Sequence, residues 1–382
     1  MSKLKPLSIA MAIIVALAIA VPGTASAAGE TITLQNSVVP HGGKLYREKR
    51  VPASMSLSVQ VHTPASSTKV NPLKRAMMKF PTDLTFNPNN RRTPICADSK
   101  LSNQSNLAAG IEATVALCPR SVIGTGTAEI YIAKVHSPTA LIADPQLIIF
   151  NAGRDSHGNA KMKIYAYSKT TNYGILMYGS LTPKGIQNVF IPVLSNDSAT
   201  AQFTLSIPGP GIQVDDGNGG TKTIKGLDPS YARTKCSTGK WTTGGTFTLG
   251  ERTFPGGAEI GPETVVDATP FTMRCTGLRG HPRLSKARAR GPRRSRRGAR
   301  KIFKIGVTNT GTAIARRVKV RVSGGGRGRS KMPKISPGQT RWTKIRVRVT
   351  GRKGSRAKFV FRLKPRNGPA ARAVARIRIL RR

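Results

Sequence analysis

After residue 300 the chain alternates apolar and basic side chains, and few folds accept that pattern. In five segments, apolar side chains take every second position while Lys or Arg takes most of the positions between them. A period of two indicates β-strands that bury one face and expose the other. The turn sequences Asn309-Thr310-Gly311 and Ser336-Pro337-Gly338 separate some of these segments, so residues 301–382 are predicted to form a small β-sandwich. The apolar positions are Phe303, Ile305, Val307, Val318, Val320, Val322, Ile345, Val347, Val349, Phe359, Phe361, Leu363, Ile377 and Ile379.

Charge is distributed very unevenly along the chain. All 16 Asp and Glu residues precede residue 279, whereas 36 of the 63 Lys and Arg residues follow it. The formal charge is +36 for residues 279–382 but only +9 for residues 28–278. Residues 279–300 carry ten basic side chains, together with Pro282 and Pro292, and little that could form a core. Such a segment buries too little apolar area to offset its ordering entropy, so it is predicted to be a basic flexible linker.

The first residues have the pattern of an export signal. Lys3 and Lys5 precede an apolar run over residues 8–21, and Ala25-Ser26-Ala27 provides small residues for cleavage. The apolar run is short for a bilayer core of about 30 Å, which argues against a membrane anchor. Residues 1–27 are therefore predicted to be a signal peptide, and the protein is expected to be secreted and extracellular or associated with the cell envelope.

Residues 28–278 have the composition of a second β domain. The chain has 39 Gly and 26 Pro but only 5% aromatic residues, which favours short strands joined by turns over helices. Many short strands argue for a β-sandwich, so the expected fold class is all-β throughout. The expected strands include Leu57, Val59 and Val61, Ile130 and Ile132, and residues 147–150, 164–167, 190–193 and 203–207.

Four cysteines, Cys96, Cys118, Cys236 and Cys275, lie in this second domain. In an exported chain an even number of widely spaced cysteines indicates disulfides, with three pairings open. Pairing Cys96 with Cys118 and Cys236 with Cys275 is favoured because each bond then closes a short local loop. The alternative is a zinc site, but zinc-binding cysteines usually occur in close pairs such as C-x-x-C, which this sequence lacks.

The C-terminal part resembles the immunoglobulin-like adhesion domain of bacterial surface proteins called CARDB (cell adhesion related domain found in bacteria). The resemblance lies in residues 305–313, 318–320, 335–340 and 342–349. It implies a seven-stranded sandwich that acts as a spacer or adhesive module, without catalytic residues. Residues 301–382 depart from that family in their complete lack of Asp and Glu.

Segments of the N-terminal part resemble recurring modules of secreted actinobacterial proteins of unknown function; they are residues 80–88, Cys96, and residues 118–126 and 236–241. This resemblance supports export and the favoured disulfide pairing, and it implies no activity.

No catalytic arrangement emerges from the residues. The five histidines are scattered and lack an H-E-x-x-H pattern. The stretch Asp215-Asp216-Gly217-Asn218-Gly219-Gly220 could bind calcium, but the same residue types form the turn of a hairpin, which the flanking residues 212–214 and 222–224 favour. The protein is therefore predicted to be non-enzymatic, without cofactor or metal; the alternative is a secreted hydrolase with an unrecognised acidic site in the N-terminal domain.

The basic tail indicates what the protein binds. Like charges facing one another destabilise a sheet, and a polyanion would relieve that repulsion. The expected partners are anionic cell-wall polymers, acidic polysaccharide or extracellular nucleic acid, with an anionic membrane surface as a further candidate. The alternative is a solvated surface that serves only solubility. The predicted polyanion-binding residues are Arg293, Arg294, Arg296, Arg297, Arg317, Lys319, Arg321, Arg346, Arg348, Arg376 and Arg378.

Overall fold

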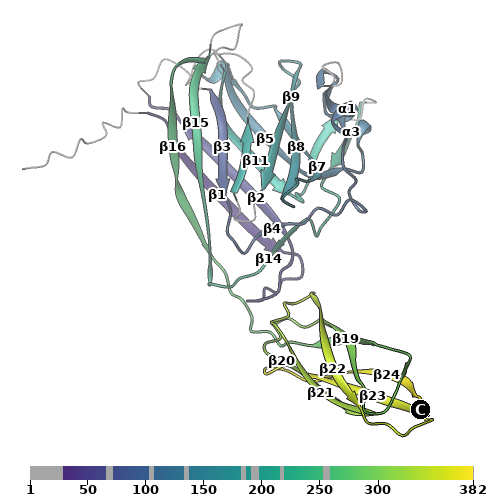
Figure 1. Ribbon diagram of the computed structural model, residues 1–382. Coiled ribbons are helices and arrows are strands. Elements are labelled where there is room, and N and C mark those ends of the chain that lie inside the picture. The colour runs from purple at the N-terminus through teal and green to yellow at the C-terminus, as the bar shows by residue number, and fades with distance from the viewer. Residues whose placement is uncertain are drawn as a thin grey trace, which may run out of the picture.

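The computed structural model describes residues 29–65, 72–102, 107–132, 137–181, 186–190, 198–215, 219–252 and 259–381, so the predicted signal peptide lies outside the described residues. Figure 1 shows two bodies of strands joined end to end by a single connection. The N-terminal domain ends near Leu278, and the C-terminal domain contains the remaining strands. Strands dominate both bodies, which confirms the all-β prediction.

One large sheet forms the N-terminal domain. Its strand order is β16-β15-β3-β10-β9-β8-β7-β5-β11-β2-β14-β4, with β1 also paired to β2 and β6 to β5. The strands are β1 (Thr31–Pro40), β2 (Val51–His62), β3 (Leu73–Lys79), β4 (Thr85–Phe86), β5 (Val122–Ile132), β6 (Leu141–Ile142), β7 (Gln146–Arg154), β8 (Ala160–Ser168), β9 (Tyr173–Leu181), β10 (Ile186–Phe190), β11 (Ser198–Ile207), β14 (Ala232–Thr234), β15 (Lys240–Arg252) and β16 (Glu259–Arg274).

This sheet curls until its ends meet. Strand β1 lies against β16, and the buried amide of Asn36 in β1 donates a hydrogen bond of 2.8 Å to the hydroxyl of Thr243 in β15. Two walls of one sheet thus face each other, and the main core fills the space between them with side chains such as Leu34, Met55 and Phe247. The packing is that of a sandwich built from a single sheet.

A smaller core lies on the outside of the curled sheet. The short helices α1 (Asp98–Leu101) and α3 (Gly110–Leu117) cover buried side chains of β7 and β8, including Phe150 and Tyr165. The hairpin β12 (Ile212–Asp215) with β13 (Thr221–Ile224) packs beside them and confirms the predicted hairpin. A single 3-10 turn, η1 (Pro138–Ala140), precedes β6. The composition did not indicate these short helices.

The C-terminal domain is a sandwich of eight strands in the order β17-β19-β22-β21-β20-β23-β24-β18. The order bends at β21, so that two sheets face each other across a core in which the ring of Phe303 lies 5.3 Å from that of Phe359 and 5.1 Å from that of Phe361. Every apolar position named from the alternation after residue 300 is buried. The strands are β17 (Leu284–Arg290), β18 (Arg294–Ser295), β19 (Arg300–Asn309), β20 (Val318–Gly324), β21 (Gly326–Met332), β22 (Thr340–Val349), β23 (Arg356–Lys364) and β24 (Ala371–Ile379).

The prediction of a flexible linker over residues 279–300 is wrong. Strand β17 pairs with β19, and β18 runs parallel to β24, so most of this segment belongs to the C-terminal sandwich. Leu284 is buried, and Ala287 and Ala289 pack against the core, between exposed basic residues. Small apolar side chains are enough to hold this segment in the sandwich, because its backbone also pairs with β19 and β24. These two strands also raise the strand number above the seven implied by the CARDB resemblance.

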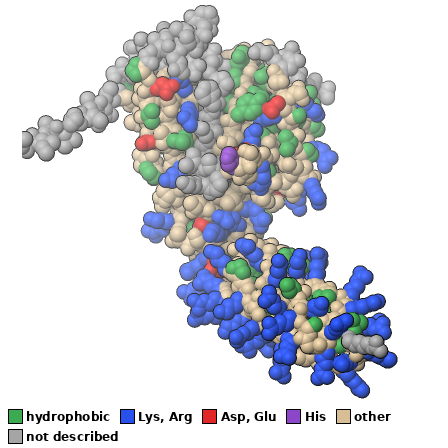
Figure 2. Space-filling view, in the orientation of Figure 1, with side chains coloured by type: hydrophobic (Ala, Val, Ile, Leu, Met, Phe, Trp, Pro, Cys, Tyr) green, Lys and Arg blue, Asp and Glu red, His purple; other side chains and the backbone are tan. Residues whose placement is uncertain are grey.

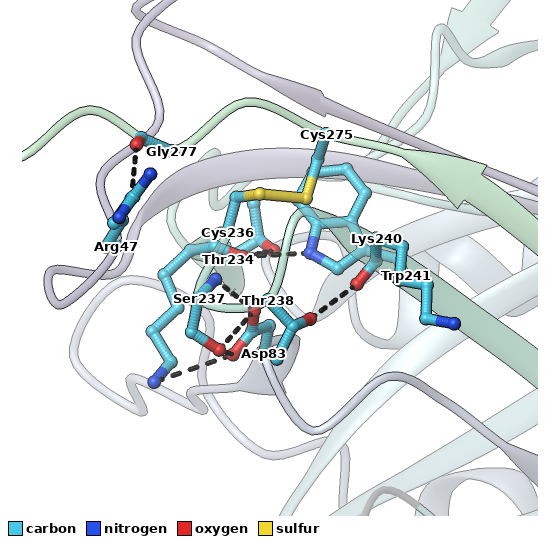
Figure 3. The surroundings of a disulfide bond; sticks show 11 residues. Arg47, Asp83, Thr234, Cys236, Ser237, Thr238, Lys240, Trp241, Cys275 and Gly277 are labelled. Carbon is cyan, nitrogen blue, oxygen red and sulfur yellow. Dashed lines mark hydrogen bonds and ion pairs between the residues drawn. A yellow bond between two sulfur atoms is a disulfide. The ribbon is translucent and has the colours of Figure 1, made fainter.

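Both favoured disulfides are present. Cys96 bonds to Cys118 and Cys236 to Cys275, with Cα–Cα distances of 5.6 and 6.0 Å. Figure 3 shows the second bond beside Trp241 and the buried carboxylate of Asp83, which accepts hydrogen bonds from the backbone and hydroxyl groups of Ser237. This cluster forms the base of the N-terminal domain, next to the connection between the two bodies. No helix within the described ranges is long and apolar enough to cross a bilayer.

Candidate anion-binding surface

The outward faces of the C-terminal sandwich are lined with cations. Strand alternation sends the apolar residues of β20, β23 and β24 inward and their Lys and Arg residues outward. In Figure 2, Lys and Arg side chains cover most of the visible surface of this domain. The described Lys and Arg side chains of the domain are exposed, except for Lys301, which is half-buried.

Cations directly face cations across neighbouring strands. Arg362 in β23 lies opposite both Arg321 in β20 and Arg372 in β24, and Lys358 lies opposite Arg376. Directly opposed side chains have Cβ atoms about 4.5–5.5 Å apart, and like charges at that separation destabilise the sheet. The buried core has to hold the sandwich together against this repulsion, so an anion bound across these rows would stabilise the folded domain.

Five arginines converge at one edge of this face. Arg293, Arg294, Arg356, Arg376 and Arg378 line a depression that holds about 690 Å³ of unfilled space, counting its open side. We call this depression the arginine pocket.

Strand pairing puts these arginines together. Arg378 in β24 lies opposite Arg294 of β18 on one side and Arg356 of β23 on the other. The backbone N–H of Arg378 donates to the carbonyl of Arg293 at 3.0 Å, and that of Leu380 donates to the carbonyl of Ser295 at 2.9 Å. These bonds fix the segment that was predicted to be a linker, and they give the pocket a rigid backbone.

The predicted binding residues are spread over more than one surface. Four of them, Arg293, Arg294, Arg376 and Arg378, meet in the arginine pocket. Lys319 and Arg321 lie on β20 in the same sheet, and Arg317 directly precedes that strand. The others lie elsewhere: Arg296 and Arg297 in the turn after β18, and Arg346 and Arg348 on β22 in the facing sheet.

Arg356 is a pocket residue that the sequence interpretation missed. It begins β23, directly after the turn at Gly354-Ser355, and the alternation Arg356-Ala357-Lys358-Phe359 was the pattern that could have identified it. Its place beside Arg378 depends on the register of β23 with β24, which alternation does not specify.

An exposed tryptophan lies on β22, away from the arginine pocket. The indole of Trp342 is 45% exposed and lies under the guanidinium of Arg290, whose central carbon is 5.2 Å from the ring centre. Gly306 on the neighbouring strand leaves room for the indole, since a Cβ atom there would come within 2.6 Å of it. Trp342 is thus an exposed reporter on a cationic face, whereas Trp241 is buried.

Among the described residues, the side-chain carboxylates that contact the C-terminal domain come from the N-terminal domain, because the sequence has no Asp or Glu after Asp267. Glu48 accepts hydrogen bonds from the backbone of Ile314 at 2.6 Å and from Arg316 at 2.8 Å. This contact lies at the junction and involves none of the pocket arginines. Because no carboxylate is among its lining residues, the pocket presents a cluster of positive charge.

Comparison of this chain with known protein families and with curated proteins finds no match.

Proposed function

We propose that this is a secreted, non-enzymatic adhesion or binding protein of the cell envelope or extracellular space, whose C-terminal domain binds polyanions. The arginine pocket carries the proposal, because five arginines line it in a domain with no acidic residue of its own. The partners proposed are anionic cell-wall polymers, acidic polysaccharide or extracellular nucleic acid. The two disulfides fit an oxidising compartment, as export requires.

The proportion of Arg to Lys in the C-terminal domain supports anion binding over a role in solubility alone. Among the basic residues of residues 279–382, 26 are Arg and ten are Lys, whereas residues 28–278 contain ten Arg and 15 Lys. A general preference of the source for arginine would affect both parts alike. Arginine binds phosphate, sulfate and carboxylate groups through two parallel hydrogen bonds, which lysine cannot do. The enrichment therefore follows the domain that carries the pocket.

The resemblance to the CARDB domain fits the same proposal, because it implies a spacer or adhesive module. The rigid sandwich would present its cationic faces to a repeating anionic polymer, and successive anionic groups would occupy successive rows of arginines.

Salt dependence provides the first test. Binding of the full chain to inorganic polyphosphate and to heparin should weaken linearly in a plot of log K against log salt, with a slope set by the number of charges neutralised. The fluorescence of Trp342 gives an intrinsic signal for contacts near β22. Affinity that is unchanged between low and high salt would rule out polyanion binding.

A pair of matched variants then separates the contribution of the arginine pocket to affinity from the contribution of net charge. The first replaces Arg294, Arg356, Arg376 and Arg378 by Gln, and the control replaces Arg288, Arg300, Arg341 and Lys344 on the facing sheet by Gln. Each variant removes four exposed charges. At roughly 0.5 kcal/mol per exposed ion pair, the pocket variant should lose about 30-fold in affinity, and the control distinctly less. Equal losses would show that only net charge matters.

A further inference from the structure

A cavity opens on the inner face of the curled N-terminal sheet. Its floor is formed by buried side chains, among them Leu57, Met78, Ile164, Met177 and Leu205. The cavity has a volume of about 110 Å³. That is close to the roughly 150 Å³ of an engineered apolar cavity that binds benzene, whereas ordinary cores contain few voids larger than a water molecule.

Strand register explains why the space exists. One row of opposed residues runs across the sheet through Ile175, Ala166, Leu147, Gly126 and Leu205. Ala166, which lines the cavity in this row, is too small to reach the opposite wall of the curled sheet. Small side chains at neighbouring lining positions, Ala76 and Ala128, extend the space. The cavity therefore results from side-chain size at inward positions of regular strands.

The cavity is closed at its floor and open at its mouth. Floor residues are at most 7% exposed, whereas the rim residues Ala128, Ile130 and Phe203 are half-buried and Tyr173 is 50% exposed. The rim lies at the ends of the strands remote from the domain junction, since Ile130 opposes Thr200 at the end of β5 while the first residues of β2 pair with β14 beside the disulfide of Cys236. The mouth thus faces away from the C-terminal domain.

The lining selects the chemistry of a ligand. Every lining residue is uncharged, and the few polar groups lie near the mouth, where the hydroxyl of Ser168 already donates to Asp144 at 2.7 Å. A charged or strongly hydrated molecule would lose its water without finding partners in such a site. The lining on β8 and β9 covers three successive inward positions, from Ile164 to Ser168 and from Tyr173 to Met177, so the space extends about 13 Å along the strands.

We infer that the N-terminal domain binds an unbranched hydrocarbon chain, as carried by a lipid, in this cavity with the polar end of the molecule at the mouth. The elongated, uncharged lining carries this inference. It concerns a site and a ligand class separate from the polyanion site of the C-terminal domain, so either proposal can fail while the other holds.

An uncharged ligand series tests the inference without interference from the basic domain. The full chain is loaded with the neutral fluorescent probe N-phenyl-1-naphthylamine, which is then displaced by straight-chain alcohols from hexanol to dodecanol. Burial of each added methylene should tighten binding about fourfold until the chain fills the cavity, and high salt should not abolish binding. Absence of probe binding, or affinity independent of chain length, would overturn the inference.

Variants locate the site. Ala166→Phe and Ala128→Phe each place a ring in the cavity and should weaken decanol binding at least tenfold, or shorten the chain length at which affinity stops rising. Val265→Phe serves as the control, because Val265 is 62% exposed on β16 and outside the lining. Circular dichroism verifies the fold, and the smaller change Ala128→Leu replaces any variant that unfolds. Unchanged binding in folded cavity variants would assign the probe to another surface.

Discussion

The buried ammonium group of Lys163 shows how electrostatic contacts of individual residues hold the outer core together. The side chain of Lys163 on β8 is only 4% exposed, and its Nζ donates to the carbonyl of Cys96 at 2.5 Å and contacts the carboxylate of Asp98 at 2.7 Å. The hydrogen bond from Lys163 is the main reason that the pKa of Asp98 lies below its ordinary value. The pair links helix α1 to the sheet beside the first disulfide.

Replacing Asp98 by Asn should destabilise the protein by about 1 kcal/mol at neutral pH, a modest loss because the carboxylate is 68% exposed. A lowered folded-state pKa gives stability that is complete above the unfolded value of about 3.9 and is lost as pH falls through the lower folded value. Urea unfolding of wild type and Asp98→Asn at pH 7, 4 and 3 should show the difference shrinking below pH 4. Asp267→Asn, where the carboxylate accepts from the hydroxyl of Thr246, is the control. A difference that stays constant with pH would contradict this account.

At the scale of elements, the two disulfides close loops with different tasks. The first spans 22 residues and holds the segment of α1 and α3 against the sheet, while the second spans 39 residues and ties β16 to the loop before β15. The second lies three residues before Leu278, whose N–H donates to the carbonyl of Leu45 at 2.9 Å. It therefore holds the base on which the connection to the C-terminal domain rests.

Removal of either disulfide by double Cys→Ser substitution should cost roughly 3–4 kcal/mol, since loops of these lengths gain freedom in the unfolded chain. The local effects should differ. Without the bond between Cys96 and Cys118, hydrogen exchange should speed up around α3, and without the bond between Cys236 and Cys275 it should speed up around residues 45–48 and 276–280. Losses below 1 kcal/mol for both variants, measured by chemical unfolding, would show that neither loop is constrained in this way.

The sequence predicted strands well where alternation was strong. Residues 301–382 gave the correct buried face because β-branched residues alternate with cations that cannot be buried. Residues 279–300 were misread because alanine is a weak apolar marker, and the pairing of Arg294 with Arg378 joins positions far apart in the chain. The candidate site was predictable in residue type and in four of its five arginines, but its convergence depends on that register. The cavity was not predictable, because the contact of β1 with β16 brings together strands more than 200 residues apart.

At the scale of the whole molecule, the junction sets how the two domains lie. Tyr46 forms a parallel bridge with Leu278, and the side chain of Arg47 donates to the carbonyl of Gly277 at 3.0 Å. From the other side, Glu48 accepts from Ile314 and Arg316. Three consecutive residues of the N-terminal domain thus hold both the connecting segment and the body of the sandwich.

Replacing Glu48 by Gln should weaken this junction by about 1 kcal/mol without unfolding either domain, because one charged partner of an exposed arginine is lost. Small-angle X-ray scattering should then report a wider range of domain orientations and a larger spread of end-to-end distances. Glu112→Gln is a suitable control, since Glu112 pairs with Lys222 inside the N-terminal domain. Scattering profiles that are identical for both variants would show that the other junction contacts suffice.

The cavity mouth and the basic domain lie at opposite ends of the molecule, and this arrangement affects how the molecule would orient on a charged surface. The basic domain lies at one end of the long axis (Figure 1), and the cavity mouth lies at the strand ends remote from it. The charge of the molecule is therefore polarised along the axis on which the cavity opens. Near a negatively charged layer it would stand upright, with the cationic end down. An apolar ligand of the N-terminal cavity would then enter from the surrounding medium and be released into it, on the side away from the charged layer.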